Sequence, residues 1–229
     1  METGSDILFF WVARMVMMCQ YFTGSFPFKA VLLHPMVRDA SGAKMSKSLG
    51  NVIDPIEVIE GRSPEQLIHN LENMTLSEAE LKKWKILFSY SEENRATRRV
   101  KSETPNGIPE CGTDALRFSL CVYMEQDRQI NLDLARVEGY RRFCNKIWQA
   151  VKFYLLAADT MPSDSSFVDS FDAWTLTRFK DTLELVNSAL ENNDLATSSS
   201  ALYSFFLYDF CDVYIEVCKP RLASEVHKV

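Results

Sequence analysis

The sequence KAVLLHPMVRDASGAKMSKSLGN, residues 29–51, contains the elements that decide the fold of the first part of this chain. Its first six residues form a short Val/Leu-rich run that is typical of a buried parallel strand. The polar run 39–42 supplies a turn, and Lys44 and Lys47 follow it. Two ammonium groups three residues apart, beside small hydroxyl residues and a glycine, can close over a triphosphate while backbone N–H groups approach its oxygens. The stretch therefore predicts a phosphate-binding loop.

Upstream of this stretch, the apolar run 7–21 predicts a helix that ends near Gly24. Residues 3–6 offer several N-caps, and the helix is apolar nearly all round, so we expect it to need protein on every side. A membrane segment is disfavoured because Arg14 interrupts a run that is already short. A secretory signal is disfavoured because acidic and polar residues precede the run. The order of helix, strand and glycine-containing loop is typical of a Rossmann-like sheet, in which ligands bind at the carboxyl ends of the strands.

Downstream of the loop, the pattern becomes helical. Asp54-Pro55 and Ser63-Pro64 each place a capping side chain before a proline at the first helical position, which predicts two short helices. The run 104–112, with two prolines and two glycines, then interrupts a charged stretch. Further helices are expected at 113–124 with Thr113 as the cap, at 134–158 with Asp133 as the cap, at 171–191 and at 195–218, the last ended by Pro220. Their spacing favours an antiparallel bundle.

These elements predict an α/β fold followed by an all-α fold. The expected domains are part of a Rossmann-like nucleotide-binding fold over 1–74, a helical connector over 75–130 and a helical bundle over 131–229. The charged segment 82–101 and the tail 223–229 match no expected element.

Composition limits the partners that the chain can bind. A net charge of −6 argues against nucleic-acid binding through overall charge, so any RNA contact requires a local basic surface. The six cysteines include no C-x-x-C pair, which favours a reduced interior over disulfides or a zinc site. The three histidines form no expected catalytic or metal-binding set, and His34 is expected to be a hydrogen-bonded polar residue at the strand end.

The motifs resemble those of class I aminoacyl-tRNA synthetases, and among them the valyl-tRNA synthetases. Residues 44–48 are similar to the KMSKS signature of that class. Similar blocks lie along nearly the whole chain, namely TGxDI at 3–7, FFWVARM at 9–15, GIPECGTDALRF at 107–118, INxD at 130–133 and GYRxFCNKxW at 139–148, where x marks a position outside the resemblance. In place of the first two blocks, isoleucine enzymes typically carry Gly-x-Asp-Gln and Arg-Gly-Trp-Phe. Ile7 and the Phe-Phe-Trp run therefore favour the valine enzymes.

The resemblance implies ATP-dependent activation of valine to valyl-adenylate and transfer of the valyl group to tRNA(Val), in the cytoplasm. Its expected partners are valine, tRNA(Val) and ATP with accompanying Mg²⁺, without a structural metal and without a membrane. It also implies that 1–74 corresponds to the C-terminal half of the catalytic core. The bundle 131–229 would begin an anticodon-binding domain.

Site residues follow from the same resemblance. Lys44 and Lys47 are expected to stabilise the charge that builds on the phosphates as pyrophosphate leaves, which raises the rate rather than the affinity. Trp11 is expected to face the valine side chain. The residues expected to bind ATP or the adenylate are Gly4, Asp6, Ile7, Met36, Val37, Met45, Ser46 and Ser48. Three alternatives stay open: the lysine loop is only solvated surface, Asp6 is only a helix N-cap, and Trp11 is only a core residue.

Basic residues accumulate on the expected helix 134–158, where no acidic residue follows Glu138 before Asp159. A local cationic surface of this kind can contact RNA phosphates on an acidic protein. The expected tRNA-binding residues are Arg136, Arg141, Arg142 and Lys146. The alternative is a solvated face, because cations are favoured toward a helix C-terminus.

The chain lacks the His-Ile-Gly-His type motif and the editing domain that members of this family carry. We therefore expect a fragment or truncated product, unable to activate valine alone, with apolar surface exposed around 7–18. The alternative is a non-catalytic tRNA-binding or scaffold product. An in-frame upstream coding segment with the missing motif would distinguish the two.

Overall fold

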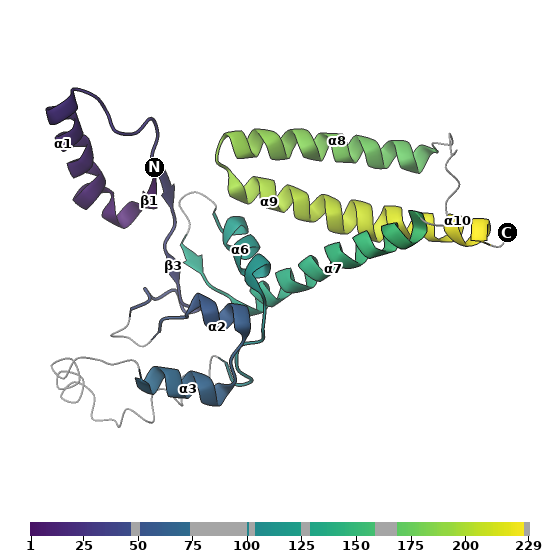
Figure 1. Ribbon diagram of the computed structural model, residues 1–229, viewed down its shortest axis with the longest axis horizontal. Coiled ribbons are helices and arrows are strands. Elements are labelled where there is room, and N and C mark those ends of the chain that lie inside the picture. Colours follow the sequence, from purple (N-terminus) through teal and green to yellow (C-terminus); the bar gives the residue numbers. More distant parts are fainter. Residues whose placement is uncertain (47–50, 74–99, 101–103, 125–128, 159–168, 227–229) are drawn as a thin grey trace. The chain divides into compact units, whose positions relative to one another are not determined.

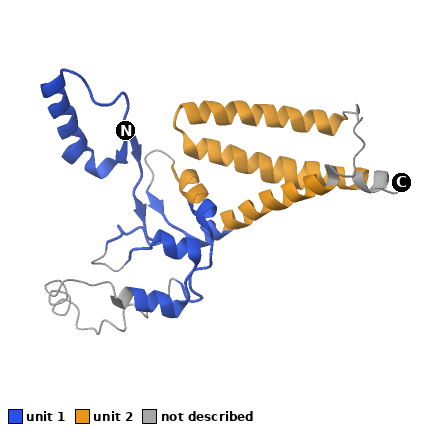
Figure 2. Cartoon of the chain, viewed as in Figure 1, with its two compact units in different colours: residues 1–116, 126–138 blue, residues 117–125, 139–229 orange. Residues whose placement is uncertain are grey.

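The computed structural model describes residues 1–46, 51–73, 100, 104–124, 129–158 and 169–226. The chain divides into two compact units, shown in different colours in Figure 2. The first unit contains residues 1–116 and 126–138, and the second contains residues 117–125 and 139–229. Lys47, Ser48 and nearly all of the charged segment 82–101 lie outside the described residues.

Two pairs of parallel strands organise the first unit (Figure 1). β1 (Glu2–Gly4) pairs with β2 (Leu32–His34), so that Gly4 lies beside His34. β3 (Val37–Arg38) pairs with β4 (Ile130–Asn131). Parallel pairing of strands that are distant in the sequence confirms the α/β class expected for this part, although the paired region of the predicted strand 29–34 is limited to its last three residues.

The segment between β1 and β2 is helical, but it begins differently from the prediction. It contains the 3₁₀ turn η1 (Ser5–Ile7), the π-helical turn η2 (Leu8–Val12) and the helix α1 (Ala13–Thr23). The predicted end is confirmed, because Gly24 follows α1 with a φ of 68°, a conformation that favours glycine. The alternative that Asp6 is an N-cap is wrong: Gly4 occupies that position, Asp6 lies inside η1, and no side chain caps the turn.

Large apolar side chains of this segment are exposed. Phe9 is 78% exposed and Tyr21 82%, and the exposed set also includes Phe10, Met17, Met18, Phe22 and Phe26. The expectation of apolar surface around 7–18 is therefore confirmed, and the surface continues to Phe26. Val12, in η2, is the buried apolar residue of this segment, and α1 itself has no buried residue.

The two short helices predicted after the lysine loop are confirmed as α2 (Pro55–Glu60) and α3 (Pro64–Asn73). The Asp54 carboxylate accepts the Ile56 N–H at 2.8 Å, so it caps α2 as expected. Ser63 and Gln66 exchange hydrogen bonds between side chain and backbone in both directions at the start of α3. The capping rules therefore place both helix starts correctly.

The core of the first unit forms where the chain returns after α3. Arg62 and Ile108 exchange two backbone hydrogen bonds of 2.8 Å, and Gly107, with a φ of 77°, allows this close approach. A Cβ atom at Gly107 would lie 2.3 Å from the Arg62 carbonyl oxygen, so no larger residue fits. Val58 and Cys111 are buried beside this contact and are joined by a backbone hydrogen bond of 3.0 Å.

The second unit is helical, as expected for the bundle (Figure 1). It draws residues from α6 (Thr113–Val122) and α7 (Leu134–Ala158) and contains α8 (Ser170–Glu191), α9 (Leu195–Ser204), the π-helical segment η4 (Phe205–Ile215) and α10 (Glu216–Val226). α7 has the predicted bounds, and Asp133 accepts the Ala135 N–H at 2.9 Å. α6 begins at Thr113 itself, one residue earlier than a cap at Thr113 would allow.

Aromatic side chains fill the centre of this bundle. The Phe143 ring lies 4.7 Å from that of Tyr203 and 5.2 Å from that of Phe118, measured between centroids, and Tyr140 contacts both Phe118 and Tyr203. Phe143 and Tyr140 are buried. Tilted and edge-to-face contacts of this kind add to the energy of apolar burial. The sequence pattern had predicted the helices but not this set of contacts.

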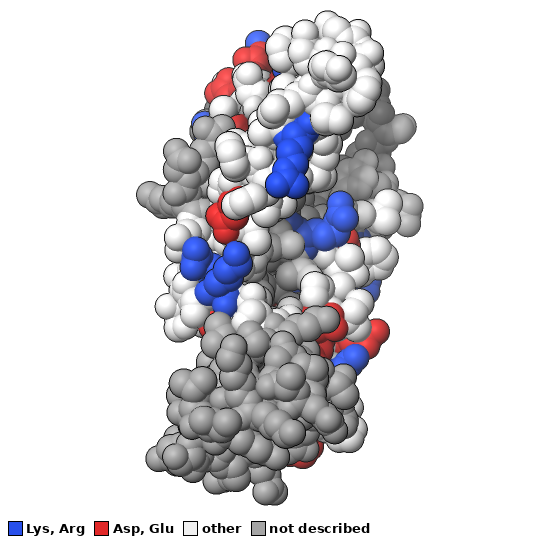
Figure 3. Space-filling view, turned by 90° about the vertical axis from the view of Figure 1, so that its left-hand side faces the viewer, with Lys and Arg blue, Asp and Glu red and all other residues white. Residues whose placement is uncertain are grey.

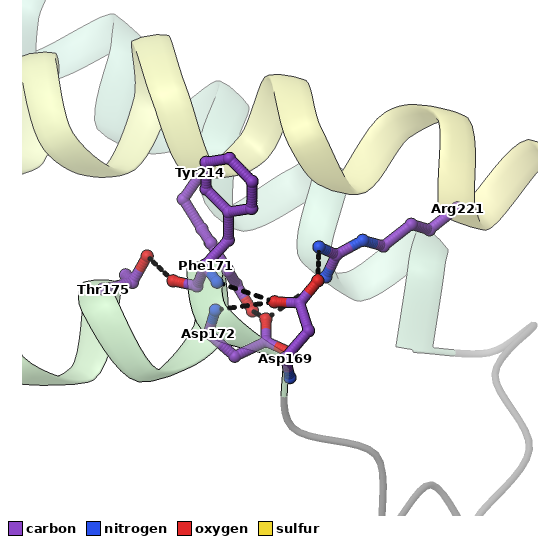
Figure 4. A network of polar contacts seen from close by, with 6 residues as sticks. All are labelled: Asp169, Phe171, Asp172, Thr175, Tyr214 and Arg221. Carbon is purple, nitrogen blue, oxygen red and sulfur yellow. Dashed lines mark hydrogen bonds and ion pairs between the residues drawn. The ribbon is translucent and has the colours of Figure 1, made fainter.

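The prediction that Pro220 ends the last helix is wrong, because Pro220 lies inside α10. The reason is a polar network at the start of α8 (Figure 4). Asp169 and Asp172 form a capping box there, and Arg221, the residue after the proline, makes ion pairs with both carboxylates. The Tyr214 hydroxyl donates to Asp172 at 2.9 Å. These contacts hold both sides of Pro220 against α8, which offsets the local cost of proline in a helix.

Among the described residues, no helix is both long enough and apolar enough to cross a membrane.

Candidate nucleotide site at the lysine loop

The lysine loop begins at the carboxyl end of β3, where a parallel strand pair presents its ligand-binding edge. The chain turns at Asp39 and returns so that Lys44 forms an antiparallel bridge with Arg38. Asp39 and Ala43 close the turn with a backbone hydrogen bond of 3.0 Å. Gly42 has a φ of 82°, and the Asn131 side chain from β4 lies beside it. The loop is therefore fixed to the strand pair at its first end.

The Asp39 carboxylate holds this turn together from inside. One oxygen accepts the Ser41 and Ala43 N–H groups and the Ser41 hydroxyl, at 3.1, 2.8 and 2.6 Å. The side chain is buried, at 5% exposure. Burial by itself would raise the pKa of Asp39, but the hydrogen bonds from Ser41, Asn51 and Ala43 outweigh it and lower the pKa to about 2. The carboxylate is therefore ionised at neutral pH.

Asn51 joins the turn to the later part of the loop. Its Nδ2 donates to Asp39 Oδ2 at 2.8 Å and to the Lys44 carbonyl at 3.1 Å. Its Oδ1 accepts the Ser46 N–H at 2.8 Å. Asn51 is also 5% exposed, so these contacts lie out of water. The amide therefore fixes the backbone on both sides of Met45.

Lys44 and Asp6, two residues predicted to serve the same ligand, lie together in the structure. The Lys44 Nζ is 3.4 Å from Asp6 Oδ2. Their side chains are 63% and 46% exposed, so both remain open to an incoming anion or hydroxyl group. The ammonium can neutralise phosphate oxygens, and the carboxylate can accept hydrogen bonds from ribose hydroxyls.

Gly4 and Met36 also meet, at the end of β1. A Cβ atom at Gly4 would lie 3.0 Å from the Met36 sulfur, so a side chain there would push against Met36. Val37 follows in β3, and Ile7 follows Asp6 with 47% exposure. The structure thus places Gly4 next to Met36 and Asp6 next to Lys44. Met45 and Ser46 lie partly exposed on the loop, whereas the predicted Lys47 and Ser48 lie outside the described residues.

Trp11 lies in the π-helical turn η2. Its indole N–H donates to the Thr3 hydroxyl at 3.1 Å, and Thr3 is buried at 3% exposure. The indole itself is 40% exposed, so the alternative of a core tryptophan is wrong. Its hydrogen bond fixes the orientation of an apolar ring whose face remains available to a ligand.

The basic residues expected to bind tRNA, Arg136, Arg141, Arg142 and Lys146, are all exposed on α7. Arg142 and Lys146 are one helical turn apart and share a face, whereas Arg136 and Arg141 project from other faces. Lys146 Nζ lies 3.5 Å from Asp212 in η4. On the face drawn in Figure 3, which is turned toward the left-hand side of Figure 1, Lys and Arg side chains lie in separate groups. The structure therefore does not bring the four residues into one continuous stripe.

In the part of the chain that the structure describes, no three His, Cys, Asp or Glu side chains are grouped so that they could hold a metal ion. None of the six cysteines, all of which lie among the described residues, forms a disulfide.

Asp39 and Asn51 are the site residues that the sequence did not identify. The sequence assigned Asp39 only to a turn and gave Asn51 no role. A signal was available: a short carboxylate and a short amide lie five residues before and seven residues after Lys44, and both residue types favour hydrogen bonds to nearby backbone. Their contact with each other depends on the folded loop.

Comparison with known proteins places this geometry in a family. Residues 1–133 match the tRNA synthetases of class I (I, L, M and V), and residues 172–228 match the anticodon-binding domain of tRNA ligases. Among solved structures, the chain is similar to LeuRS of Agrobacterium radiobacter K84, from a ternary complex with tRNA and LeuAMS. The TM-score is 0.55 and the identity 16%, over 89% of this chain and 21% of that one, so the likeness concerns the fold.

Sequence relatives are more specific. The chain is 49% identical to the human valine–tRNA ligase, over 97% of this chain and 17% of that protein. It is 47% identical to the Caenorhabditis elegans valine–tRNA ligase, over 98% and 21%, and 44% identical to the probable mitochondrial valine–tRNA ligase of Dictyostelium discoideum, over 99% and 22%. The chain thus spans about a fifth of the length of these relatives. The family match over more than half of its residues shows that this chain belongs to the class I tRNA synthetases (I, L, M and V).

Proposed function

We propose that this chain belongs to a valine–tRNA ligase. In its reaction, ATP and valine form valyl-adenylate with release of pyrophosphate, and the valyl group then passes to tRNA(Val). The observation that carries the proposal is the approach of Lys44 to Asp6 at the edge of a parallel strand pair. An ammonium and a carboxylate at that edge suit the phosphates and the ribose of ATP, which would enter with its Mg²⁺ as substrate. Identity of 44–49% to valine–tRNA ligases over nearly the whole chain supports valine as the amino acid.

In this proposal Lys44 and Lys47 stabilise the phosphates as the bond to pyrophosphate breaks. Gly4, Asp6, Met36 and Val37 form the nucleotide side of the site, together with Ile7, Met45, Ser46 and Ser48. Trp11 faces the valine side chain. The exposed indole, fixed by Thr3, supports that role because it offers a broad apolar wall in a defined orientation.

The test of the reaction is valine-dependent exchange between ATP and pyrophosphate, measured on the complete protein that contains these residues. Lys47→Ala is expected to slow adenylate formation far more than it weakens valine binding, because the lysine acts on charge that develops in the transition state. Lys180→Ala, at an exposed lysine of α8, is the control. Equal losses in rate and in valine affinity would contradict the proposed role of Lys47.

The 229 residues alone are expected to be inactive in this assay. Their described part exposes a large apolar surface along 7–26 and contains two strands in each sheet, and they match about a fifth of the length of each relative. Exchange activity from the isolated chain would overturn this part of the proposal. If the complete protein binds tRNA(Val) but never supports exchange, the alternative of a non-catalytic tRNA-binding product replaces the ligase.

Binding of tRNA is proposed for the helical bundle, whose residues 172–228 match the anticodon-binding domain of tRNA ligases. Arg136, Arg141, Arg142 and Lys146 are the candidate phosphate contacts. Neutralising one such residue should weaken binding to every tRNA similarly and reduce the salt dependence of the affinity. A cytoplasmic location is also proposed, and microscopy of the tagged complete protein tests it, since the relatives include mitochondrial enzymes.

A further inference from the structure

We propose that Asp39 and Asn51 form a polar clamp that positions Lys44, and that the proposed adenylation reaction depends on this clamp although neither residue touches a substrate. The inference rests on the proposed function for its catalytic consequence, and on the geometry of the loop for the clamp itself.

The first step is the saturation of the Asn51 amide. The two N–H groups of its Nδ2 donate to Asp39 Oδ2 and to the Lys44 carbonyl, and its Oδ1 accepts the Ser46 N–H. These partners also fix which atom is oxygen, because the Ser46 N–H requires an acceptor and the other two partners require donors. No residue other than asparagine supplies this pattern at this length. Glutamine carries the same groups on a longer chain, and aspartate lacks the donors.

The second step is the attachment of the clamp to the strands. Asp39 directly follows β3, and its other carboxylate oxygen takes the N–H groups of Ser41 and Ala43 together with the Ser41 hydroxyl. The Leu132 N–H donates to the carbonyl of Arg38, the residue before Asp39, at 3.0 Å. The Lys44 and Ser46 backbones are therefore connected through Asn51 and Asp39 to the paired strands.

The third step is that the clamp residues fix the backbone at Lys44, whereas the Lys44 side chain remains exposed. Asp39 and Asn51 are each 5% exposed, so they are not available to a ligand. The Lys44 side chain is 63% exposed and reaches Asp6. Clamp residues thus fix the backbone from which an exposed ammonium projects. Charge stabilisation in a transition state falls steeply with small misplacement, so a loose backbone at Lys44 should lower the rate without removing any group that binds substrate.

The test uses the complete protein and compares Asn51→Leu with Asn70→Leu. Asn70 is the matched control, because its amide makes a hydrogen bond of the same length, 2.8 Å to Glu57, on the exposed surface of α3. Asn51→Leu should lower kcat for valine-dependent ATP–pyrophosphate exchange by about tenfold or more while the KM for valine changes less than about threefold. Asn70→Leu should leave both unchanged. A proportional change in kcat and in the amount of folded protein would overturn the positioning role.

A second set of variants covers the case in which Asn51→Leu does not fold. Asn51→Asp places a second carboxylate beside Asp39, which should free the loop. The double variant Asp39→Asn/Asn51→Asp restores a hydrogen bond between the two positions with the donor and the acceptor exchanged, and the new carboxylate at position 51 can still accept the Ser46 N–H. It should therefore recover part of the rate that Asn51→Asp loses. Strictly additive effects of the two substitutions would overturn the clamp.

Hydrogen exchange of the Ser46 amide supplies a readout that does not depend on catalysis. The amide is expected to be protected in the wild type and in Asn70→Leu, and to exchange faster in Asn51→Leu and Asn51→Asp. If the wild type shows no valine-dependent ATP–pyrophosphate exchange, the proposed function fails. Faster hydrogen exchange of the Ser46 amide in the Asn51 variants would still support the clamp in that case. If the Ser46 amide exchanges hydrogen faster in the Asn51 variants but their kcat is unchanged, the positioning role is overturned while the proposed function stands.

Discussion

The Lys44 ammonium lies 3.4 Å from the Asp6 carboxylate, which joins two residues that are 38 positions apart in the sequence. Both side chains are about half exposed, so the pair contributes little to stability. Its value lies in position, because it places a cation and a hydrogen-bond acceptor at the same strand edge. An anionic ligand can replace Asp6 as the partner of Lys44 without any change in the strands.

Replacing Lys44 should therefore separate stability from activity. Lys44→Ala is expected to lower the free energy of unfolding by less than about 1 kcal/mol, because an exposed ion pair is lost. In the complete protein it should slow valine-dependent exchange by about a hundredfold, which is typical when one charge-stabilising group is removed. Lys180→Ala, which breaks the exposed pair with Glu184, is the matched control. Similar activity of the two variants would contradict a role for Lys44.

Protonation of Asp39 should make the loop sensitive to acid. The pKa of Asp39 is lowered to about 2, so its contribution to stability is complete above the unfolded pKa of about 4 and is lost as pH falls through 2. The contribution should amount to no more than about 2 kcal/mol. Denaturant melts at pH 7 and pH 2.5 measure it: the wild type should lose most of this advantage over Asp39→Asn on acidification. Asp181→Asn, at an exposed position of α8, is the control.

The hydrogen bond between Trp11 and Thr3 predicts unequal effects of two substitutions. Trp11→Phe leaves the buried Thr3 hydroxyl without its donor, whereas Thr3→Val leaves an unpaired indole N–H on a side chain that is 40% exposed. Both substitutions should therefore lose about 1 kcal/mol of unfolding free energy for the hydrogen bond itself. In addition, Trp11→Phe should cost about 1–2 kcal/mol, and Thr3→Val should cost less. Chemical denaturation of both variants and of the double variant measures the coupling. In the complete protein, Trp11→Phe should also raise the KM for valine, and an unchanged KM would contradict the assigned pocket.

The polar network at the start of α8 predicts that the hydrogen bond between Tyr214 and Asp172 stabilises the second unit most when Asp172 is ionised. Tyr214→Phe removes the donor to the part-buried Asp172 carboxylate and should lower the unfolding free energy by about 1.5–3 kcal/mol at pH 7. Burial alone would raise the pKa of Asp172, but the Asp169 N–H, Tyr214 and Arg221 outweigh it and lower the pKa. The penalty of Tyr214→Phe should therefore shrink as acid protonates Asp172. Tyr154→Phe, at an exposed ring of α7, is the control, and a penalty independent of pH would contradict this account.

Exposed apolar side chains along 7–26 predict poor behaviour of the isolated chain. Seven of them lie close together in sequence, namely Phe9, Phe10, Met17, Met18, Tyr21, Phe22 and Phe26. Apolar surface of this extent favours association and binding of hydrophobic dyes. The purified chain should bind such a dye and scatter light as concentration rises, and Phe9→Ser/Phe22→Ser should reduce both signals. A monomeric chain that binds no dye would contradict the prediction.

Local rules in the sequence were sufficient for most helix boundaries. Asp54-Pro55, Ser63-Pro64 and Asp133 each mark a helix start that the structure has, and Gly24 marks a helix end. These signals succeed because caps and left-handed glycines act within one helical turn. Pro220 shows where they fail: its local preference to end a helix is outweighed by Arg221, whose partners lie about fifty residues earlier in the chain.

The sequence by itself determined that a lysine loop follows a parallel strand and that a helical bundle follows the α/β part, because strand, cap and helix patterns are written in neighbouring residues. Only the tertiary structure decided that Asp6 reaches Lys44, that Thr3 orients Trp11, and that Asn51 closes onto Asp39. Each of these contacts joins residues whose spacing matches no local period. The contact of Asp6 with Lys44 depends on strand pairing that brings distant segments together, and this pairing must offset the entropy of closing the chain between them. The other two contacts depend on turns that the folded chain makes within a shorter stretch.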